Sequence, residues 1–128
     1  MRRPAKAPTT ETAWKNRLLA AFGEVPGVLV WCQNAGKLVV NGPGGVYAIK
    51  LAPEGAADIT GVGPGGVHIE VECKMSKGRN RAAQLHWAER MSGLGAVHFA
   101  AWYDASLTVE ANVAAQVTRL RELLSARR

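Results

Sequence analysis

The chain is predicted to fold as one α/β domain, with a mixed central β-sheet flanked by helices. Hydrophobic residues make up 48% of its 128 residues and charged residues 20%, a balance typical of a globular protein. Short apolar segments of strand character fill the middle of the chain, and segments with helical periodicity lie at both ends and before the last strand. Strands joined through a helix pair in parallel and strands joined by tight turns pair antiparallel, so the sheet should be mixed.

The first half of the chain predicts a helix followed by strands. Residues 10–22 read TETAWKNRLLAAF, with apolar side chains at helical spacing and Thr9 or Thr10 as the expected N-cap. Asn34-Ala35-Gly36 separates the first two strands and predicts a hairpin between them. The segments of strand character, bounded by Gly, Pro and Asn, are 28–33, 37–40, 45–51 and 56–62.

The second half alternates strands and helices. A strand is expected at 67–74 and another at 96–102, with helices at about 80–93 and at 107–126. Trp87 and Trp102 are expected in the core. The apolar face expected for the helix at 80–93 consists of Leu85, Ala88, Met91 and Leu94.

Basic residues give the chain a formal charge of +6 and a pI near 9.8. They gather at the two ends of the chain and in one internal cluster. A polyanion such as nucleic acid is one partner that this pattern suits, because phosphate contacts supply most non-specific affinity. Ordinary solvated tails remain the other interpretation. The internal cluster consists of Lys74, Lys77, Arg79 and Arg81.

The sequence predicts an intracellular, cytoplasmic protein (in the host cytoplasm if it is viral). No apolar run approaches the ~20 residues that span a bilayer. Residues 1–9 are basic without a following apolar stretch, so they suggest a flexible tail rather than a secretory signal. Cys32 and Cys73 belong to no Cys/His cluster, which favours free thiols in a reducing compartment and no structural zinc.

The strand HIEVECK at 68–74 has one apolar and one charged face. Glu70, Glu72 and Lys74 alternate with residues of core character. If the segment ending near Asp58 is the neighbouring strand, Asp58 and Glu72 meet at one edge of the sheet. Two converging carboxylates suit Mg²⁺ or Mn²⁺, and a lysine beside them can contact a phosphate and the attacking water. The alternative is a structural ion-pair ladder on a half-exposed strand.

Residues 55–99 carry further motifs in a fixed order. The acid Asp58 is followed by Glu72-Cys73-Lys74, a loop glycine at Gly78, a helix that opens with Gln84, and a later glycine at Gly95. This arrangement resembles the core of the VRR-NUC domain, the virus-type replication–repair branch of the PD-(D/E)xK nucleases. The resemblance covers 55–99 well and the N-terminal half loosely. It implies a restriction-endonuclease-like core over a single domain, 1–128.

The resemblance implies a phage-type DNA endonuclease that hydrolyses phosphodiester bonds with Mg²⁺ or Mn²⁺, often in branched or junction DNA during replication, repair or recombination. Asp58 and Glu72 would bind the metal, together with the backbone carbonyl of Cys73. Lys74 would contact the phosphate and the nucleophilic water, Gln84 would orient the lysine or the substrate, and Glu11 would complete the acidic site. Lys77, Arg79 and Arg81 would bind DNA. The resemblance also implies a homodimer, with no membrane and no small-molecule cofactor.

Two positions depart from the family pattern. Ala57 stands where the family usually has proline, and Arg81 where a small hydroxyl residue is common. Neither change removes a metal ligand. Glu70 leaves an ambiguity because it competes with Glu72 as ligand, although the spacing to Lys74 favours Glu72. A non-catalytic DNA-binding protein that keeps the nuclease fold is the main alternative function.

Overall fold

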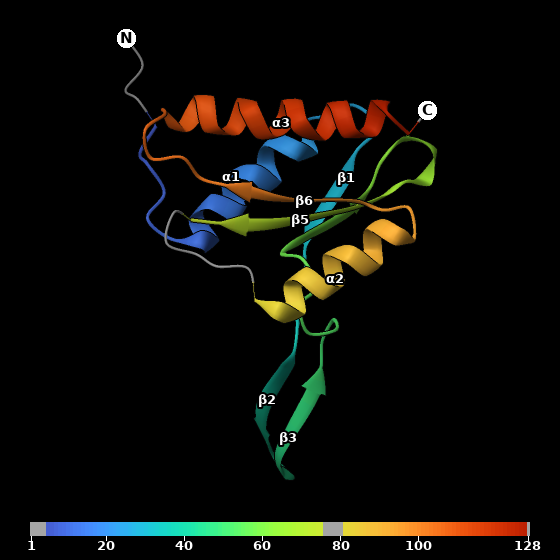
Figure 1. The fold of residues 1–128 in the computed structure, drawn as a ribbon. Coiled ribbons are helices and arrows are strands. Elements are labelled where there is room, and N and C mark those ends of the chain that lie inside the picture. Colours follow the sequence, from blue (N-terminus) through green and yellow to red (C-terminus); the bar gives the residue numbers. More distant parts are fainter. Residues whose placement is uncertain (1–4, 76–80, 128) are drawn as a thin grey trace.

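The computed structural model describes residues 5–75 and 81–127. A four-stranded sheet lies between α1 and α3 on one face and α2 on the other (Figure 1). In chain order the elements are α1 (Glu11–Gly23), β1 (Leu29–Cys32), β2 (Lys37–Gly42), β3 (Gly45–Lys50), β4 (Ile59–Val62), the short 3₁₀ turn η1 (Pro64–Gly66), β5 (His68–Lys74), α2 (Ala82–Gly93), β6 (Val97–Trp102) and α3 (Val109–Ser125). None of the helices in these residues is long and apolar enough to cross a bilayer.

The predicted mixed sheet is confirmed. Its strand order is β1-β4-β5-β6, and β1, β4 and β5 pair antiparallel. β6 pairs in parallel with β5 after the chain has crossed through α2. This crossover places the start of α2 near the C-terminal end of β5, which is where the charged residues of HIEVECK lie. The Thr10 side chain caps α1 by accepting a hydrogen bond from the Ala13 amide, as one of the two predicted caps.

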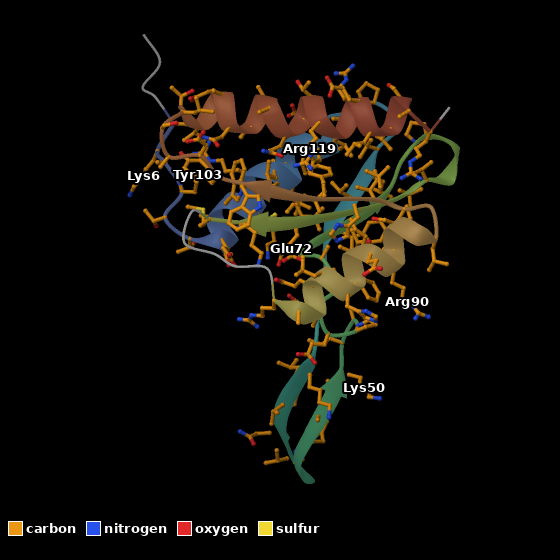
Figure 2. All side chains as sticks on the ribbon, in the orientation of Figure 1. Lys6, Lys50, Glu72, Arg90, Tyr103 and Arg119 are labelled. Carbon is orange, nitrogen blue, oxygen red and sulfur yellow. The ribbon has the colours of Figure 1, made fainter. Side chains whose placement is uncertain are left out.

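The predicted hairpin between the first two strands is wrong. β1 pairs with β4 at the edge of the main sheet, and the hairpin is formed by β2 and β3, with Lys37 opposite Lys50. The turn lies instead at the tip, where Gly45 has a φ of +116° that favours glycine. This two-stranded hairpin projects away from the body of the protein (Figure 1). Figure 2 shows Lys50 on it, below α2 in the view.

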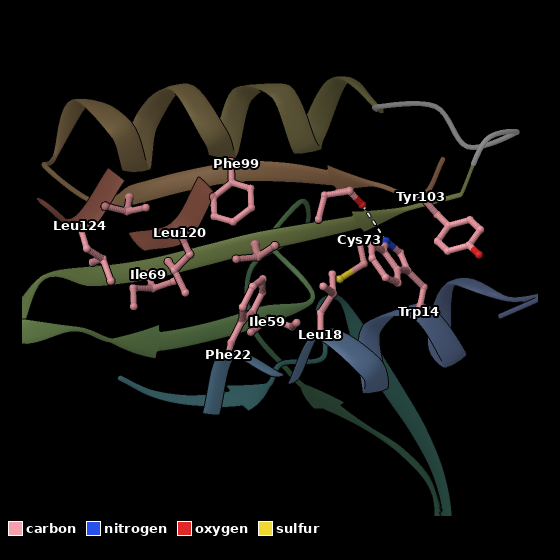
Figure 3. Packing of buried hydrophobic residues seen from close by; sticks show 13 residues of the cluster. Trp14, Leu18, Phe22, Ile59, Ile69, Cys73, Phe99, Tyr103, Leu120 and Leu124 are labelled. Carbon is pink, nitrogen blue, oxygen red and sulfur yellow. Dashed lines mark hydrogen bonds between the residues drawn. The ribbon is translucent and has the colours of Figure 1, made fainter. Parts of the chain in front are cut away.

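The hydrophobic core fills the space between the sheet and the helices α1 and α3 (Figure 3). The apolar face of β5 supplies Ile69, Val71 and Cys73, as the alternation predicts. The Trp14 indole donates a hydrogen bond of 2.9 Å to the Ala101 carbonyl, so the ring is satisfied although it is fully buried. The helices contribute Trp14, Leu18, Phe22, Leu120 and Leu124.

The predicted apolar face of α2 is only half correct. Ala88 and Met91 are half-buried as predicted, but Leu85 and Leu94 are exposed. The physical reason is that α2 covers the charged face of β5, so hydrogen-bonding side chains turn inward in place of leucine. Trp102, expected in the core, is also exposed. The half-buried positions of α2 are Ala83, Gln84, Trp87, Ala88 and Met91.

Candidate active site

The charged face of β5 is buried, not half-exposed. Glu70 is 1% exposed, Glu72 is 3% and Lys74 is 4%. Charged side chains at such positions are costly unless they are paired and hydrogen-bonded. An ordinary ladder of surface ion pairs therefore does not describe these residues. Figure 2 shows Glu72 in the middle of the molecule, between the sheet and α2.

The antiparallel register of β4 and β5 brings Asp58 to this face. Ile59 pairs with Val71, so one further step along the ladder puts Asp58 opposite Glu72. Asp58 Oδ2 accepts a hydrogen bond of 2.8 Å from the Cys73 amide, and the Asp58 carbonyl accepts one of 2.8 Å from the Gln33 amide. Both its backbone and its side chain are thus fixed by neighbouring strands. The predicted meeting of Asp58 and Glu72 is what this register produces.

The Gln84 side chain links Lys74 to Glu72. Its Oε1 accepts a 2.8 Å hydrogen bond from Lys74 Nζ, and its Nε2 donates one of 2.8 Å to Glu72 Oε1. The same Oε1 also accepts from the Arg81 amide at 3.0 Å, so Gln84 caps the first turn of α2. One amide therefore holds the lysine and a carboxylate and ties both to the start of the helix.

The Glu72 carboxyl group has a strongly raised pKa. Burial, then a hydrogen bond with Asp58 and the charge of Asp58, raise its pKa from 4.5 to about 8; Lys74 opposes this and Glu11 adds to it. Its Oε2 is buried and has no donor among the described residues. Since the group facing it is another acid, only a shared proton or a cation can join the two.

Glu11 lies within electrostatic range of this pair. It is the first residue of α1, and its charge raises the pKa of both Glu72 and the Cys73 thiol. The structure therefore brings the loosely predicted Glu11 toward the same site from a third element. Burial and the nearby carboxylates hold the Cys73 thiol far above its usual pKa, so it is no nucleophile.

Glu70 occupies a separate network on the same strand. Its Oε1 accepts a 2.6 Å hydrogen bond from the Trp87 indole, and Gln33 Nε2 lies 3.5 Å from its Oε2. His68 Nε2 is 3.7 Å from the same oxygen. Both Glu70 oxygens have partners, whereas one Glu72 oxygen has no donor in the part of the chain that the structure describes, so the geometry favours Glu72 as the ligand.

Sequence reasoning missed Gln33 and the role of Trp87. Gln33 follows β1 and supports the Asp58 loop through its amide and through a 3.3 Å bond from its side chain to the Ala57 carbonyl. Trp87 is half-buried rather than part of the core, and its indole donates a hydrogen bond to Glu70. A glutamine after an apolar strand and a tryptophan one turn after Gln84 were the only signals in the sequence.

The predicted DNA-binding residues are only partly described. Lys77 and Arg79 lie outside the residues that the structure describes, as does Gly78. Arg81 is exposed immediately before α2, beside Gln84. It thus lies near Asp58, Glu72, Lys74 and Gln84, which together form the charged cluster, and a phosphate bound there would be close to its guanidinium group.

The donor set fits a magnesium-type cation better than a zinc-type one. Within residues 5–75 and 81–127, no group of three or more His, Cys, Asp or Glu side chains is arranged to hold a metal ion. Mg²⁺ is commonly bound by one or two carboxylates and completes its coordination with water and substrate phosphate. Asp58 and the open oxygen of Glu72 meet this smaller requirement. The Cys73 carbonyl stays a predicted further ligand.

The sequence was also compared with known proteins. No family model and no curated protein sequence matches it. The resemblance to VRR-NUC domains therefore rests on the motifs alone and stays a prediction. The fold itself brings together Asp58, Glu72, Lys74 and Gln84.

The segment before Asp58 gives a test of how the site is held. Gly55 and Gly36 both have a φ of +88°, but a Cβ at Gly55 would overlap the Ala83 carbonyl in the first turn of α2, whereas one at Gly36 would meet nothing within 4 Å. Gly55→Ala is expected to lower the free energy of unfolding by about 1–3 kcal/mol more than Gly36→Ala, because the helix start must move. Urea unfolding of both variants measures the difference. Equal losses would show that Gly55 does not support α2.

Proposed function

We propose that this protein is a divalent-metal-dependent endonuclease that hydrolyses phosphodiester bonds in DNA. The resemblance to VRR-NUC domains and the basic composition support DNA as the substrate and branched or junction DNA as a preferred form. One observation carries the proposal. Asp58 lies opposite Glu72 on neighbouring strands, a buried Glu72 oxygen has no donor within residues 5–75 and 81–127, and Gln84 holds the adjacent lysine in place.

The raised pKa of Glu72 shows that the Asp58–Glu72 pair does not carry two negative charges without compensation. One shared proton or one bound cation supplies the missing positive charge. Glu72 at a pKa of about 8 keeps a proton at neutral pH unless a positive charge replaces it. A site poised in this way is common where carboxylates serve as metal ligands or as acids and bases.

Each residue has a distinct role in the proposed reaction. Asp58 and Glu72 would hold the cation, which would supply Lewis-acid polarisation of the phosphodiester and lower the pKa of the attacking water. Lys74 places its ammonium group next to these carboxylates, where it stabilises negative charge on the phosphate oxygens. Gln84 fixes the lysine by accepting from Nζ, and its amide keeps Glu72 Oε1 turned toward α2.

Cleavage of a DNA panel tests the proposal. The panel contains linear duplex, flap, splayed and four-way junction DNA, each incubated with Mg²⁺, with Mn²⁺ and with EDTA. Cleavage that requires metal is the expected result, and the substrate that is cut fastest identifies the preferred structure. Binding to DNA that is independent of metal, without cleavage of any substrate, would instead show a DNA-binding protein that keeps the nuclease fold.

A further inference from the structure

We propose that the β2–β3 hairpin is a DNA-binding arm that enters a groove of the duplex beside the phosphodiester to be cut. This inference rests on the proposed function, because it assumes that DNA lies over the charged cluster. It assigns a role to the hairpin residues 37–50, which the chemistry described above does not use.

The hairpin is built as a free-standing ribbon. Its two six-residue strands pair with each other, and among the described residues neither strand pairs with the main sheet. All of β3 and most of β2 is exposed. An isolated two-stranded hairpin is marginally stable in water. A ribbon of this kind is therefore expected to gain order from a partner that contacts it.

Its base is joined to the candidate active site. The Ala35–Ala52 bridge and the hydrogen bonds of 2.9 Å from the Gly36 amide to the Ala52 carbonyl and from the Leu51 amide to the Gly36 carbonyl close the ribbon. Beyond it, Gly55 packs against the Ala83 carbonyl, next to Gln84. A duplex that spans the charged cluster and extends past the start of α2 would meet the ribbon.

Charge favours a polyanion as the occupant. Residues 37–50 contain two lysines and no acid. Lys37 and Lys50 lie directly opposite each other across the ladder, on the same face. Like charges at opposed positions of a sheet repel each other and cost free energy. A phosphate between the two ammonium groups removes this repulsion and makes two charge-assisted contacts.

The face of the hairpin that carries Lys37 and Lys50 also has a shape and side chains suited to contacting a DNA groove. By alternation, Val39 and Asn41 share this face, as does Val46 nearer the tip. Val39 is 66% exposed and Val46 is 70% exposed. A two-stranded ribbon fits the major groove of B-DNA, and strands also read the minor groove, where apolar side chains wedge between base steps. Asn41 adds a donor and an acceptor for base edges.

A second copy of the chain is the competing occupant, and it fits less well. The opposite face of the ribbon carries Leu38, Val40, Tyr47 and Ile49, none of them more than 51% exposed. Even at about 150 Å² for each whole side chain, this face offers on the order of 300 Å², against about 800 Å² per partner in a stable interface. Packing two ribbons would leave the lysine repulsion unrelieved.

The test removes the two charges and measures DNA binding. Lys37→Gln/Lys50→Gln is compared with the wild type and with Lys6→Gln/Arg121→Gln, which loses the same charge on exposed residues outside the hairpin. Dissociation constants are measured in EDTA at several salt concentrations, on the panel described above. We expect the hairpin variant to bind roughly ten-fold or more weakly at 100 mM salt, with a salt dependence reduced by about two ion contacts.

A second readout separates this inference from the proposed function. Hydrolysis of a small phosphodiester, thymidine 5′-p-nitrophenyl phosphate, needs the charged cluster but is too short to reach the hairpin. The DNA-binding role of the hairpin is supported if the wild type and the hairpin variant hydrolyse this substrate equally well while the variant binds DNA more weakly. No hydrolysis by the wild type counts against the nuclease, whatever the hairpin does.

Two results would contradict the proposal that the hairpin binds DNA. The first is equal DNA affinity in the wild type and the hairpin variant, or an equal loss in both double variants, which would mean a general effect of charge. The second is a change of molecular mass in solution when Leu38 and Ile49 are replaced by serine, with DNA affinity per subunit unchanged. That result would assign the ribbon to a homodimer interface.

Discussion

Lys74→Met is expected to lower the rate of DNA cleavage by roughly 10²- to 10⁴-fold while the protein stays folded. Methionine keeps the length of the buried aliphatic stem but removes the ammonium group that Gln84 holds. The phosphate then loses its cationic contact next to Glu72. Lys74 also lowers the pKa of Glu72, so its removal strengthens the protonation of that acid. Single-turnover cleavage of the best substrate in the panel, with saturating Mg²⁺, measures the loss.

Lys15→Met is the matched control. Lys15 lies on α1, and its charge reaches the site because it lowers the pKa of the Cys73 thiol. The Lys15→Met substitution therefore removes a nearby positive charge but leaves the contact between Lys74 and Gln84 intact. We expect a loss of less than about ten-fold for this variant, by comparison with the general acid–base range. Similar rates for both variants, or a fully active Lys74→Met, would contradict the role given to Lys74.

The order of elements was predictable from local patterns, but the strand pairing was not wholly so. The alternation in β5 and the glycine turn before it were enough to predict the antiparallel neighbour that brings Asp58 to Glu72. The hairpin at 34–36 was wrong because a turn signal does not say which strand lies next in space. β1 pairs with β4, which is distant in the sequence, and among the described strands β2 and β3 pair with each other alone.

Residues of the candidate site with charged side chains could be predicted from the sequence. Residues that only hold another side chain in place were harder to predict. Asp58, Glu72 and Lys74 follow from carboxylate and lysine spacing, and Gln84 from the resemblance. The role of Trp87 required knowledge that α2 covers a charged face, because its indole contacts Glu70. The same fact explains why Leu85, apolar and in phase, is exposed.

Glu72→Gln is expected to stabilise the metal-free protein at pH 8 and to abolish cleavage. In the wild type, Glu72 has a pKa of about 8 in the folded state against its ordinary 4.5. Between these values the folded state holds a proton that the unfolded state has released, so the free energy of unfolding falls as pH rises. The stabilisation is complete below pH 4.5 and is lost as pH rises through about 8. Glutamine, which is always neutral, removes this loss.

Thermal unfolding in EDTA from pH 5 to pH 8.5 measures the effect. A pKa difference of one between the folded and unfolded states, worth about 1.4 kcal/mol, changes the Tm of a domain of this size by about 5 °C. The wild-type Tm should fall over this window, and that of Glu72→Gln should fall less. Millimolar Mg²⁺ at pH 8 should raise the wild-type Tm, because a ligand of the folded state stabilises it. The variant, which lacks the anionic ligand, should respond little.

Glu70→Gln is the control that distinguishes the loss of a metal ligand from the loss of any buried acid. Glu70 lies two positions away on the same strand and the same face, and it is equally buried, but its oxygens are engaged by Trp87 and Gln33. This variant should lose stability, since the indole donor loses its charged acceptor. It should keep the response of Tm to Mg²⁺. If Glu70→Gln lost that response and Glu72→Gln kept it, the ligand would be Glu70, and the pairing of Glu72 with Asp58 would be structural. A response kept by both variants would place the cation elsewhere, and the open oxygen of Glu72 would then be satisfied by the proton that it shares with Asp58.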